Sequence, residues 1–278
     1  MTGAAGGIGS VVARRLAAEG MAVVLADLDA VGLLRCRDEV LAEHPGTHVV
    51  CVTGDVGDPD HHAELVVAAE EAGADGGGLR LSVLNAGVAL PGLSWEMPLE
   101  RWDLHVRVNY WGVVHGLRAA LSAMVPRGDG WVVAVSSGAG LVATPGLAPY
   151  VSTKHAVVGM MESAHHELRR IGSAVDVSVV CPGNIATAMP DRSASLAAAE
   201  GVDVDGTHPS EVGVVDELAA VIRSGVDAGA APETVADAIV DGVTAGRFWI
   251  LPQPELAWAA LDRAQRIMDG NEPVDLLG

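Results

Sequence analysis

The segment Thr2–Gly9 constrains the fold of this chain more than any other feature. It carries Gly3, Gly7 and Gly9 in the order T-G-x-x-x-G-x-G, and the residues that follow, Ser10–Glu19, have apolar side chains at helical spacing. Glycines allow a backbone to turn tightly and to approach a ligand, and a helix N-terminus offers free N–H groups to an anion. The segment therefore predicts a phosphate-binding turn at the start of a helix, with an ordinary glycine-rich turn as the alternative.

The next segment favours the phosphate-binding interpretation. Met21–Ala26 is an apolar run that predicts a buried strand, and Asp27 follows it. An acidic residue about 20 residues past the glycines is placed to accept hydrogen bonds from the ribose hydroxyls of an adenine dinucleotide. A carboxylate there repels a 2′-phosphate, no Lys or Arg lies among Ala4–Gly6, and Leu28 follows the acid. The sequence therefore predicts NAD as cofactor, in preference to NADP.

A second group of residues suggests acid–base chemistry. Trp131–Val135 predicts a buried strand, and Ser137 lies just past its C-terminal end, where ligands bind in open α/β sheets. Pro149 suits the first turn of a helix, so Tyr150 and Lys154 are expected on one helical face. A hydroxyl, a phenol and an ammonium brought together there can transfer protons. For an isolated Y-x-x-x-K pattern the alternative is a solvated helix face.

Three further motifs follow predicted strands. Asp55-Val56 comes after Val49–Val52, Asn85-Ala86-Gly87 comes after Leu81–Leu84, and Pro182–Thr187 has the pattern P-G-x-x-x-T. Together with the motifs above, and in this order, they resemble the short-chain dehydrogenase/reductase family in its compact branch. The resemblance covers roughly residues 2–190 well and the remainder loosely.

The resemblance implies the fold and the cofactor site. The expected fold is α/β, a single Rossmann-like domain over residues 1–278 with a doubly wound parallel sheet, helices on both faces and strand order 3-2-1-4-5-6-7. The apolar half of the composition suits such buried parallel strands. The cofactor-binding residues that the resemblance implies are Gly3, Gly7, Ile8, Gly9, Asp27, Asp55, Val56, Asn85, Ala86, Gly87, Tyr150, Lys154, Pro182, Gly183, Ile185 and Thr187.

The resemblance also implies a catalytic set of Asn109, Ser137, Tyr150 and Lys154. Tyr150 is expected to exchange a proton with a secondary alcohol or ketone while Ser137 hydrogen-bonds the same oxygen. Lys154 is expected to lower the pKa of Tyr150 and to bind the nicotinamide ribose. Asn109 is expected to position a water for proton relay. Other hypotheses are an NAD-binding sensor or scaffold without turnover, an inactive truncated family member, and an isomerase or dehydratase that keeps its NAD.

Substrate selectivity is expected to lie in residues 188–231, a lid with a helix over 211–226 and a mobile remainder. Its apolar residues, Val204 among them, favour a moderately hydrophobic alcohol or ketone, unless they only pack the lid down. Arg192 and Arg223 are isolated, so no cluster for a polyanionic substrate is expected. Trp95 is a candidate substrate contact, although packing is the favoured role.

The net charge and the cysteine content limit which partners, metals and cellular compartment are expected. A net charge of −19 argues against nucleic acid and against an anionic membrane surface, and no apolar run is long enough to span a bilayer. Cys36, Cys51 and Cys181 lack metal spacing, and no metal site is expected from the histidines. The odd number of cysteines favours the reducing cytoplasm.

Two expectations concern assembly. The family commonly pairs two long helices with a second subunit, here roughly Leu99–Val125 and Tyr150–Ile171, so a homodimer or homotetramer is expected. The strand that precedes the glycine loop in the family is missing, because Met1 stands directly before Thr2. Its absence is expected to leave two strand edges unpaired, and we expect the natural protein to have a short apolar extension upstream, unless the neighbouring strands close the gap.

Overall fold

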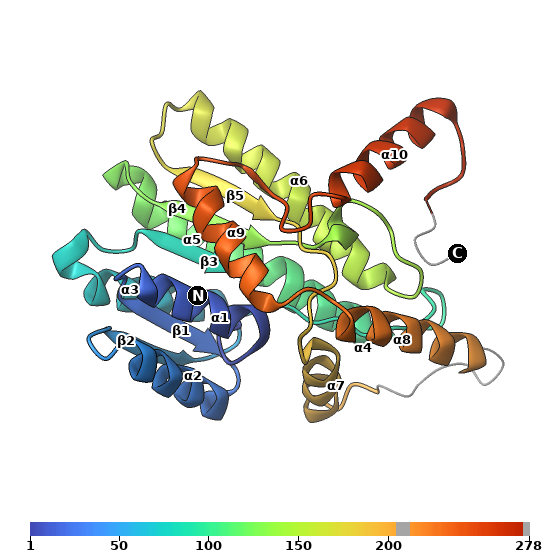
Figure 1. Ribbon diagram of the computed structural model, residues 1–278, viewed down its shortest axis with the longest axis horizontal. Helices are drawn as coiled ribbons and strands as arrows, with labels where there is room; N and C mark the ends of the chain where they lie inside the picture. Colours follow the sequence, from blue (N-terminus) through green and yellow to red (C-terminus); the bar gives the residue numbers. More distant parts are fainter. Residues whose placement is uncertain (204–211, 275–278) are drawn as a thin grey trace.

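A parallel β-sheet with helices on both faces forms the body of the molecule (Figure 1). The computed structural model describes residues 1–203 and 212–274. The strands are β1 Val23–Asp27, β2 Val49–Thr53, β3 Leu81–Leu84, β4 Trp131–Val135, β5 Asp176–Val180 and β6 Trp249–Ile250. All neighbouring strands run parallel, with Val23 opposite Val49, Leu81 opposite Trp131, and Trp131 opposite Asp176. The predicted α/β fold is confirmed.

The sheet is interrupted where the sequence predicts a missing strand. Its strands form one pair, β1-β2, and one group of four, β3-β4-β5-β6. The first residues of the chain lie between the two parts. Thr2 bridges to Ala26, and its N–H donates to the carbonyl of Val83 at 3.1 Å. The combined order is therefore the predicted one, with Met1 and Thr2 in the central position.

The gap is closed only at the end that carries the glycine loop. The amino group of Met1 donates to the carbonyl of Val24 at 3.0 Å, and the N–H of Ala26 donates to the carbonyl of Met1 at 2.9 Å. Burial lowers the pKa of this amino group to about 6. Further along the strands a cavity of about 390 Å³ opens between β1 and β3, and Met21 and Leu81 are among the residues that line it.

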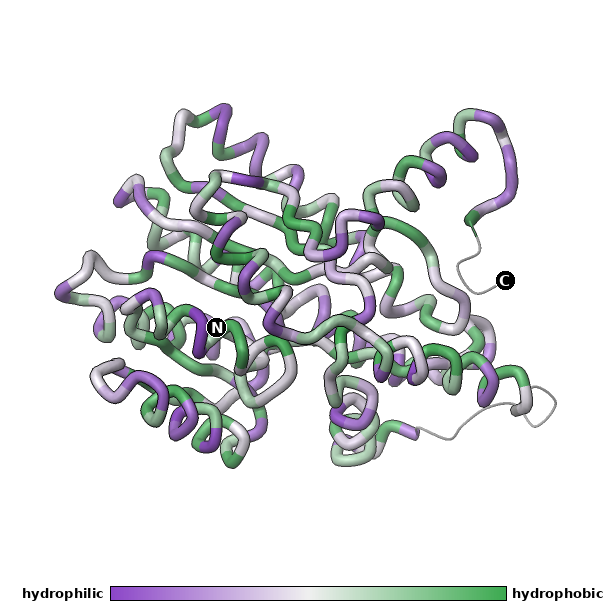
Figure 2. The backbone as a smooth tube through the Cα atoms, viewed as in Figure 1, coloured by the Kyte–Doolittle hydropathy of each residue, from purple (hydrophilic) through white to green (hydrophobic). Residues whose placement is uncertain are grey.

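Two apolar cores lie on opposite faces of the sheet, because successive side chains of a strand point in opposite directions. Val133 and Val135 pack toward α1 (Gly7–Ala18), α2 (Ala30–Glu43) and α9 (Pro232–Thr244). Val132 and Ala134 pack toward α5 (Gly112–Arg127) and α6 (Ala148–Arg170), with α3 (Pro59–Ala72) at the edge. Figure 2 shows hydrophobic residues concentrated along the strands and on the inner sides of these helices.

The remaining helices surround the ends of the strands. They are η1 Ala74–Gly76, α4 Leu99–His105, the π-helix η2 Val106–Trp111, η3 Gly138–Gly140, α7 Met189–Ala199, α8 Val212–Asp227 and α10 Leu256–Asp269. Helix α8 matches the helix predicted over 211–226, whereas α7 was expected to be irregular. Figure 1 shows α10 standing away from the sheet, and no residue of α10 is buried. No described helix is both long and apolar enough to cross a membrane.

Apolar side chains in the middle of helix α6 pack within the chain, with Met160 partly buried against the same core. Val157, Val158, Met161 and Ala164 all belong to the core between α6 and the sheet. These residues therefore do not form a free apolar face, and the oligomer expectation stays a prediction. In the other helical segment, Trp111 is 45 % exposed and its ring stacks on a histidine ring of the same chain.

Candidate active site

A cavity of about 600 Å³ lies at the C-terminal ends of the strands, between the glycine loop and α7. It brings together residues from distant motifs, as open parallel sheets do at this edge. All the residues predicted for cofactor binding or catalysis line it, except Gly9 and Asn109. The predicted residues that line it are Gly3, Gly7, Ile8, Asp27, Asp55, Val56, Asn85, Ala86, Gly87, Ser137, Tyr150, Lys154, Pro182, Gly183, Ile185 and Thr187.

The glycine loop has the backbone that its sequence predicts. Gly3 and Gly7 have positive φ angles of 66° and 55°, which other residues rarely adopt. Gly9 does not line the cavity. A side chain at this position would collide with the carbonyl of Gly3, so a glycine is needed there. Gly9 therefore shapes the turn, and helix α1 starts at Gly7 with its N-terminus at the cavity wall.

Thr2 and Asn85 tie the glycine loop to the end of β3. The hydroxyl of Thr2 accepts hydrogen bonds from the backbone N–H groups of Asn85 and Ala86, at 3.0 and 3.2 Å. The Asn85 side-chain amide donates to the carbonyls of Thr2 at 3.1 Å and Gly3 at 3.4 Å. These bonds fix the two loops relative to each other, so the cavity wall between them is preformed.

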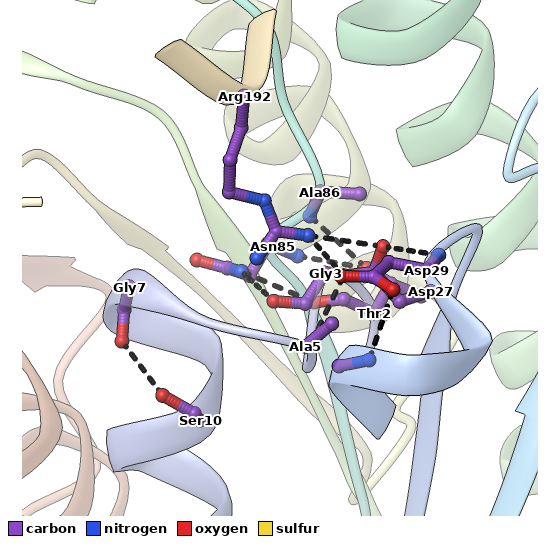
Figure 3. Close-up of polar contacts among 11 residues, drawn as sticks. Thr2, Gly3, Ala5, Gly7, Ser10, Asp27, Asp29, Asn85, Ala86 and Arg192 are labelled. Atoms are coloured by element: carbon purple, nitrogen blue, oxygen red, sulfur yellow. Dashed lines mark hydrogen bonds and ion pairs between the residues drawn. The ribbon is translucent and has the colours of Figure 1, made fainter. Parts of the chain in front are cut away.

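Asp27 lies at the end of the cavity where the prediction places the adenosine ribose (Figure 3). Its carboxylate accepts hydrogen bonds from the backbone N–H groups of Ala5 at 3.0 Å and Asp29 at 3.1 Å. The guanidinium of Arg192, on α7, contacts both carboxylate oxygens at 3.1 and 3.2 Å. Arg192 is thus paired with an acid at the cavity wall, a contact that the sequence does not predict.

Asp55, at the same end, also pairs with an arginine. Its carboxylate contacts the guanidinium of Arg107, from the π-helix, and the other Nη atom of Arg107 lies 2.6 Å from a carboxylate oxygen of Glu200. Glu200 follows the last residue of α7. Both ends of α7 are therefore joined by ion pairs to the carboxylates that the sequence assigns to adenosine.

Ser137 and Tyr150 meet at the other end of the cavity. A hydrogen bond with Ser137 favours the ionised phenol, but burial is the larger effect and raises the pKa of Tyr150 above its ordinary value. The Nζ atom of Lys154 lies 5.5 Å from the centroid of the Tyr150 ring. Desolvation thus raises the pKa of the phenol, and its expected lowering by Lys154 together with the bound cofactor stays a prediction.

Lys154 is buried beneath the cavity floor. Its Nζ donates to the carbonyl of Val135, at the end of β4, at 2.9 Å. The hydroxyl of Ser136 donates to the backbone carbonyl of Lys154 at 2.9 Å, which ties α6 to the same strand end. Burial lowers the pKa of the Lys154 ammonium to about 8. The ammonium is thus held by its hydrogen bond to Val135 and is easier to deprotonate than a lysine in water.

Asn109 lies behind Lys154, fully buried in the π-helix. Its side-chain carbonyl accepts from the N–H of Val88 at 2.8 Å, and its amide donates to the carbonyl of Val88 at 2.9 Å and to the hydroxyl of Thr153 at 3.2 Å. A Cβ on Gly87 would lie 3.2 Å from Asn109 Oδ1 and 3.5 Å from Lys154 Nζ. The side chain therefore holds the segment after β3 in place, and its role in a water relay stays a prediction.

The P-G-x-x-x-T segment completes the cavity wall opposite Tyr150. The carbonyl of Pro182 accepts a hydrogen bond from the N–H of Gly138 at 2.6 Å, and the N–H of Gly183 donates to the side chain of Gln253 at 2.9 Å. Thr187 lies against the glycine loop, since a Cβ on Gly7 would come within 3.4 Å of it. Gln253, from beyond the lid, is a contact that the motifs do not predict.

The lid residues that reach the cavity come from α7. Met189, Arg192, Ser193 and Leu196 line the cavity, and the buried hydroxyl of Ser193 accepts from a backbone N–H at 3.0 Å. Val204, one of the predicted lid residues, lies outside the described residues. Trp95 is 76 % exposed and does not line the cavity, so the structure provides no substrate contact for it.

The described residues fit a dinucleotide and offer no alternative metal centre. The turn at Gly6–Gly7 has no side chain of its own at the N-terminus of α1, and the cavity extends from there to both Asp27 and Tyr150. Within the described ranges, His, Cys, Asp and Glu side chains do not gather in groups of three or more that could hold a metal ion.

Comparisons with known proteins agree with this geometry. The family model described as short chain dehydrogenase matches residues 1–196. A CLA biosynthesis dehydrogenase/reductase from Lactiplantibacillus plantarum is 32% identical over 98% of this chain and 93% of its own. A 1-deoxy-11-beta-hydroxypentalenate dehydrogenase from Streptomyces arenae is 36% identical over 78% of this chain and 77% of its own.

A solved structure resembles the whole chain. The short chain dehydrogenase/reductase from Burkholderia phymatum, determined in complex with NAD, has a TM-score of 0.89 and 31% identity, and the match covers 100% of this chain and 96% of that one. The family model, the relatives and the fold therefore lead to one conclusion: this chain is an oxidoreductase that belongs to the short-chain dehydrogenase/reductase family.

Proposed function

We propose that this protein transfers a hydride between NAD and a secondary alcohol or ketone of moderate hydrophobicity. The observation that carries the proposal is the position of Ser137, Tyr150 and Lys154 at one end of a single cavity whose other end holds Asp27 and the glycine loop. Proton transfer and dinucleotide binding thus share one continuous space.

The bound nicotinamide accepts or supplies the hydride, and the protein supplies position and protons. Tyr150 exchanges a proton with the substrate oxygen, and Ser137 hydrogen-bonds the same atom. For reduction of a ketone Tyr150 is ready as a donor, because burial keeps the phenol protonated at neutral pH. For oxidation of an alcohol the phenol must ionise, and positive charge beside it, from Lys154 and from the oxidised cofactor, favours that state.

The cavity lining supports a substrate without phosphate groups. Among the described lining residues the cationic side chains are Lys154, which is buried under the floor, and Arg192, which lies at the Asp27 end. Apolar side chains from the lid and from the segment after β3, Met189, Leu196 and Val88, lie between the two ends. A cyclic alcohol, a steroid-like ring or a hydroxyacyl thioester would suit such a surface.

A steady-state assay that follows NADH absorbance tests the proposal. Ring alcohols, steroids, hydroxyacyl thioesters and their ketones are offered with NAD(H) and with NADP(H). We expect turnover of at least one compound with NAD(H). NADH binding without turnover of any compound would favour the sensor hypothesis, and conversion without net NADH release would favour an isomerase or dehydratase.

We propose a homodimer or homotetramer in the cytoplasm. The location is supported by three cysteines that are all free, two of them buried. The assembly is supported by exposed apolar side chains on the segment 99–111, where Leu99 is 75% exposed. Light scattering at micromolar concentration tests it, and a monomer would contradict it.

A further inference from the structure

The carboxylate of Asp27 has no acceptor capacity left in the free protein. A carboxylate offers about four lone-pair sites. Two are used by the N–H groups of Ala5 and Asp29, and two by contacts with Arg192 Nη2, at 3.1 and 3.2 Å. A ribose diol cannot bind Asp27 in addition to these partners. The backbone N–H groups belong to fixed turns, so Arg192 is the partner that has to leave.

Arg192 is suited to such an exchange. Its side chain is 39 % exposed, whereas that of Asp27 is 10 % exposed, so the arginine can move into solvent-accessible space while the acid stays fixed. Because its arginine is partly exposed to solvent, exchanging this pair for another partner of Asp27 costs less than breaking a fully buried pair. The pair joins α7 to the end of β1.

The groups around Arg192 indicate which partner its guanidinium can bind after it leaves Asp27. Its guanidinium lies directly over the glycine loop, so close that a side chain at Gly6 would collide with it. Gly6 and Gly7 lead into the N-terminus of α1, which favours anions. Thr187, two residues before α7 begins, also contacts the loop. The guanidinium of Arg192, which α7 holds at this position, can therefore reach a diphosphate bound at the loop.

We propose that Arg192 is a cofactor-binding residue that exchanges Asp27 for the diphosphate of the dinucleotide. The inference rests on the proposed function and adds to it a residue on the lid. When the ribose diol takes the carboxylate of Asp27, the guanidinium moves to the diphosphate over Gly6. Binding of the adenosine half thereby becomes coupled to the position of α7, whose other residues line the substrate side of the cavity.

Calorimetric titration of the full chain with three ligands separates this role from others. NADH and ADP-ribose carry the diphosphate, whereas adenosine carries only the ribose diol and the base. The variants are Arg192→Ala, Arg192→Lys and, as a matched control, Arg223→Ala. Arg223 is also an exposed arginine of the lid and pairs with Asp191 at 2.9 Å, but it does not line the cavity. Circular dichroism and thermal melting check that each variant is folded.

We expect Arg192→Ala to weaken NADH and ADP-ribose about tenfold, the equivalent of one charged hydrogen bond, and to leave adenosine unchanged or bound more tightly. Arg192→Lys should lie between, because an ammonium lacks the bidentate fork. Arg223→Ala should match the wild type. Equal weakening of adenosine and ADP-ribose would overturn the proposal, and so would tighter binding of all three ligands.

The same experiment distinguishes the two proposals. If the wild type binds NADH but turns over no substrate, the proposed function fails, while the ratio of adenosine to ADP-ribose affinity still tests Arg192. If turnover is present and that ratio is the same in Arg192→Ala and wild type, the role of Arg192 fails alone.

Discussion

The two ends of the cavity are held by different kinds of interaction. At the end predicted to hold adenosine, Asp27 and Asp55 are paired with Arg192 and Arg107, whose side chains are 39 % and 33 % exposed. At the Tyr150 end Lys154 and Asn109 are buried and hydrogen-bond to backbone groups and, from Asn109, to the hydroxyl of Thr153. Exposed ion pairs are weak and exchangeable, whereas buried hydrogen bonds are costly to break. The ion pairs at the Asp27 end can therefore change partners, whereas the hydrogen bonds at the Lys154 end keep its geometry fixed.

The largest effect is expected from removing the proton donor at the rigid end. Tyr150→Phe should lower turnover by at least about 100-fold, the usual contribution of a proton-transfer group, and leave NADH affinity within about threefold of wild type. Steady-state rates and calorimetric NADH binding on the same preparation measure both quantities. Near wild-type turnover would show that Tyr150 does not transfer the proton.

A comparison of wild type with Lys154→Met should show, through the pH dependence of the free energy of unfolding, how much burial of the ammonium destabilises the fold. The folded-state pKa is about 8 and the unfolded value is about 10.4, so between these values the unfolded chain binds more protons. The free energy of unfolding of wild type should therefore rise with pH across this window, by on the order of 3 kcal/mol, relative to the variant. Lys154→Met should also slow turnover.

Denaturant titrations of both proteins at about pH 8 and about pH 10 test this difference. The comparison between the two proteins removes the opposite contributions of groups that both contain, such as Cys36, whose pKa burial raises to about 11. Parallel stability curves over the window would contradict a buried ammonium with a lowered pKa.

The two ends also differ in how far the sequence alone predicts them. The strand ends, the glycine loop and the spacing of Tyr150 and Lys154 follow from local patterns, and the structure brings them to one cavity. The contact between Arg192 and Asp27 joins positions 165 residues apart, and no local pattern encodes it. The helix α7 itself had a signal that was missed, a proline and an aspartate in its first turn.

The charge state of Tyr150 depends on more than local spacing, for a related reason. The distance from Tyr150 to Lys154 along a helix is a local property, but the desolvation of the phenol depends on everything packed around it. Burial is the leading cause of the raised pKa, and it is a tertiary quantity. Sequence analysis therefore predicts which groups meet, and less well which charge state they adopt.

Cofactor preference should respond to the charge at the exchangeable end. In wild type, kcat/KM for NAD should exceed that for NADP by at least about tenfold, because the carboxylate of Asp27 opposes a 2′-phosphate. Asp27→Ala combined with Leu28→Arg should shift the preference toward NADP, since Leu28 also lines the cavity. Equal values for the two cofactors in wild type would refute the preference.

The smallest effect is expected from Arg107, which joins Asp55 to the end of α7. Arg107→Ala should destabilise the fold by only about 0.5–1 kcal/mol, because the three partners are partly exposed. It should also weaken NADH about two- to threefold, since Asp55 loses the partner that orients it. Arg80→Ala is the matched control, because Arg80 pairs with Asp129 at 3.0 Å away from the cavity.

The dependence of stability and NADH affinity on salt then shows whether ion pairs or packing hold the Asp55 end of the cavity. Raising the ionic strength to about 1 M shortens the Debye length to about 3 Å, which screens exposed pairs. The stability difference between wild type and Arg107→Ala should shrink accordingly, whereas the difference caused by Lys154→Met should persist, because buried groups are screened much less. NADH affinity should change only in Arg107→Ala and not in Arg80→Ala. If the two arginine variants behave alike, the Arg107 pair does not orient Asp55, and the adenosine end is held by packing instead.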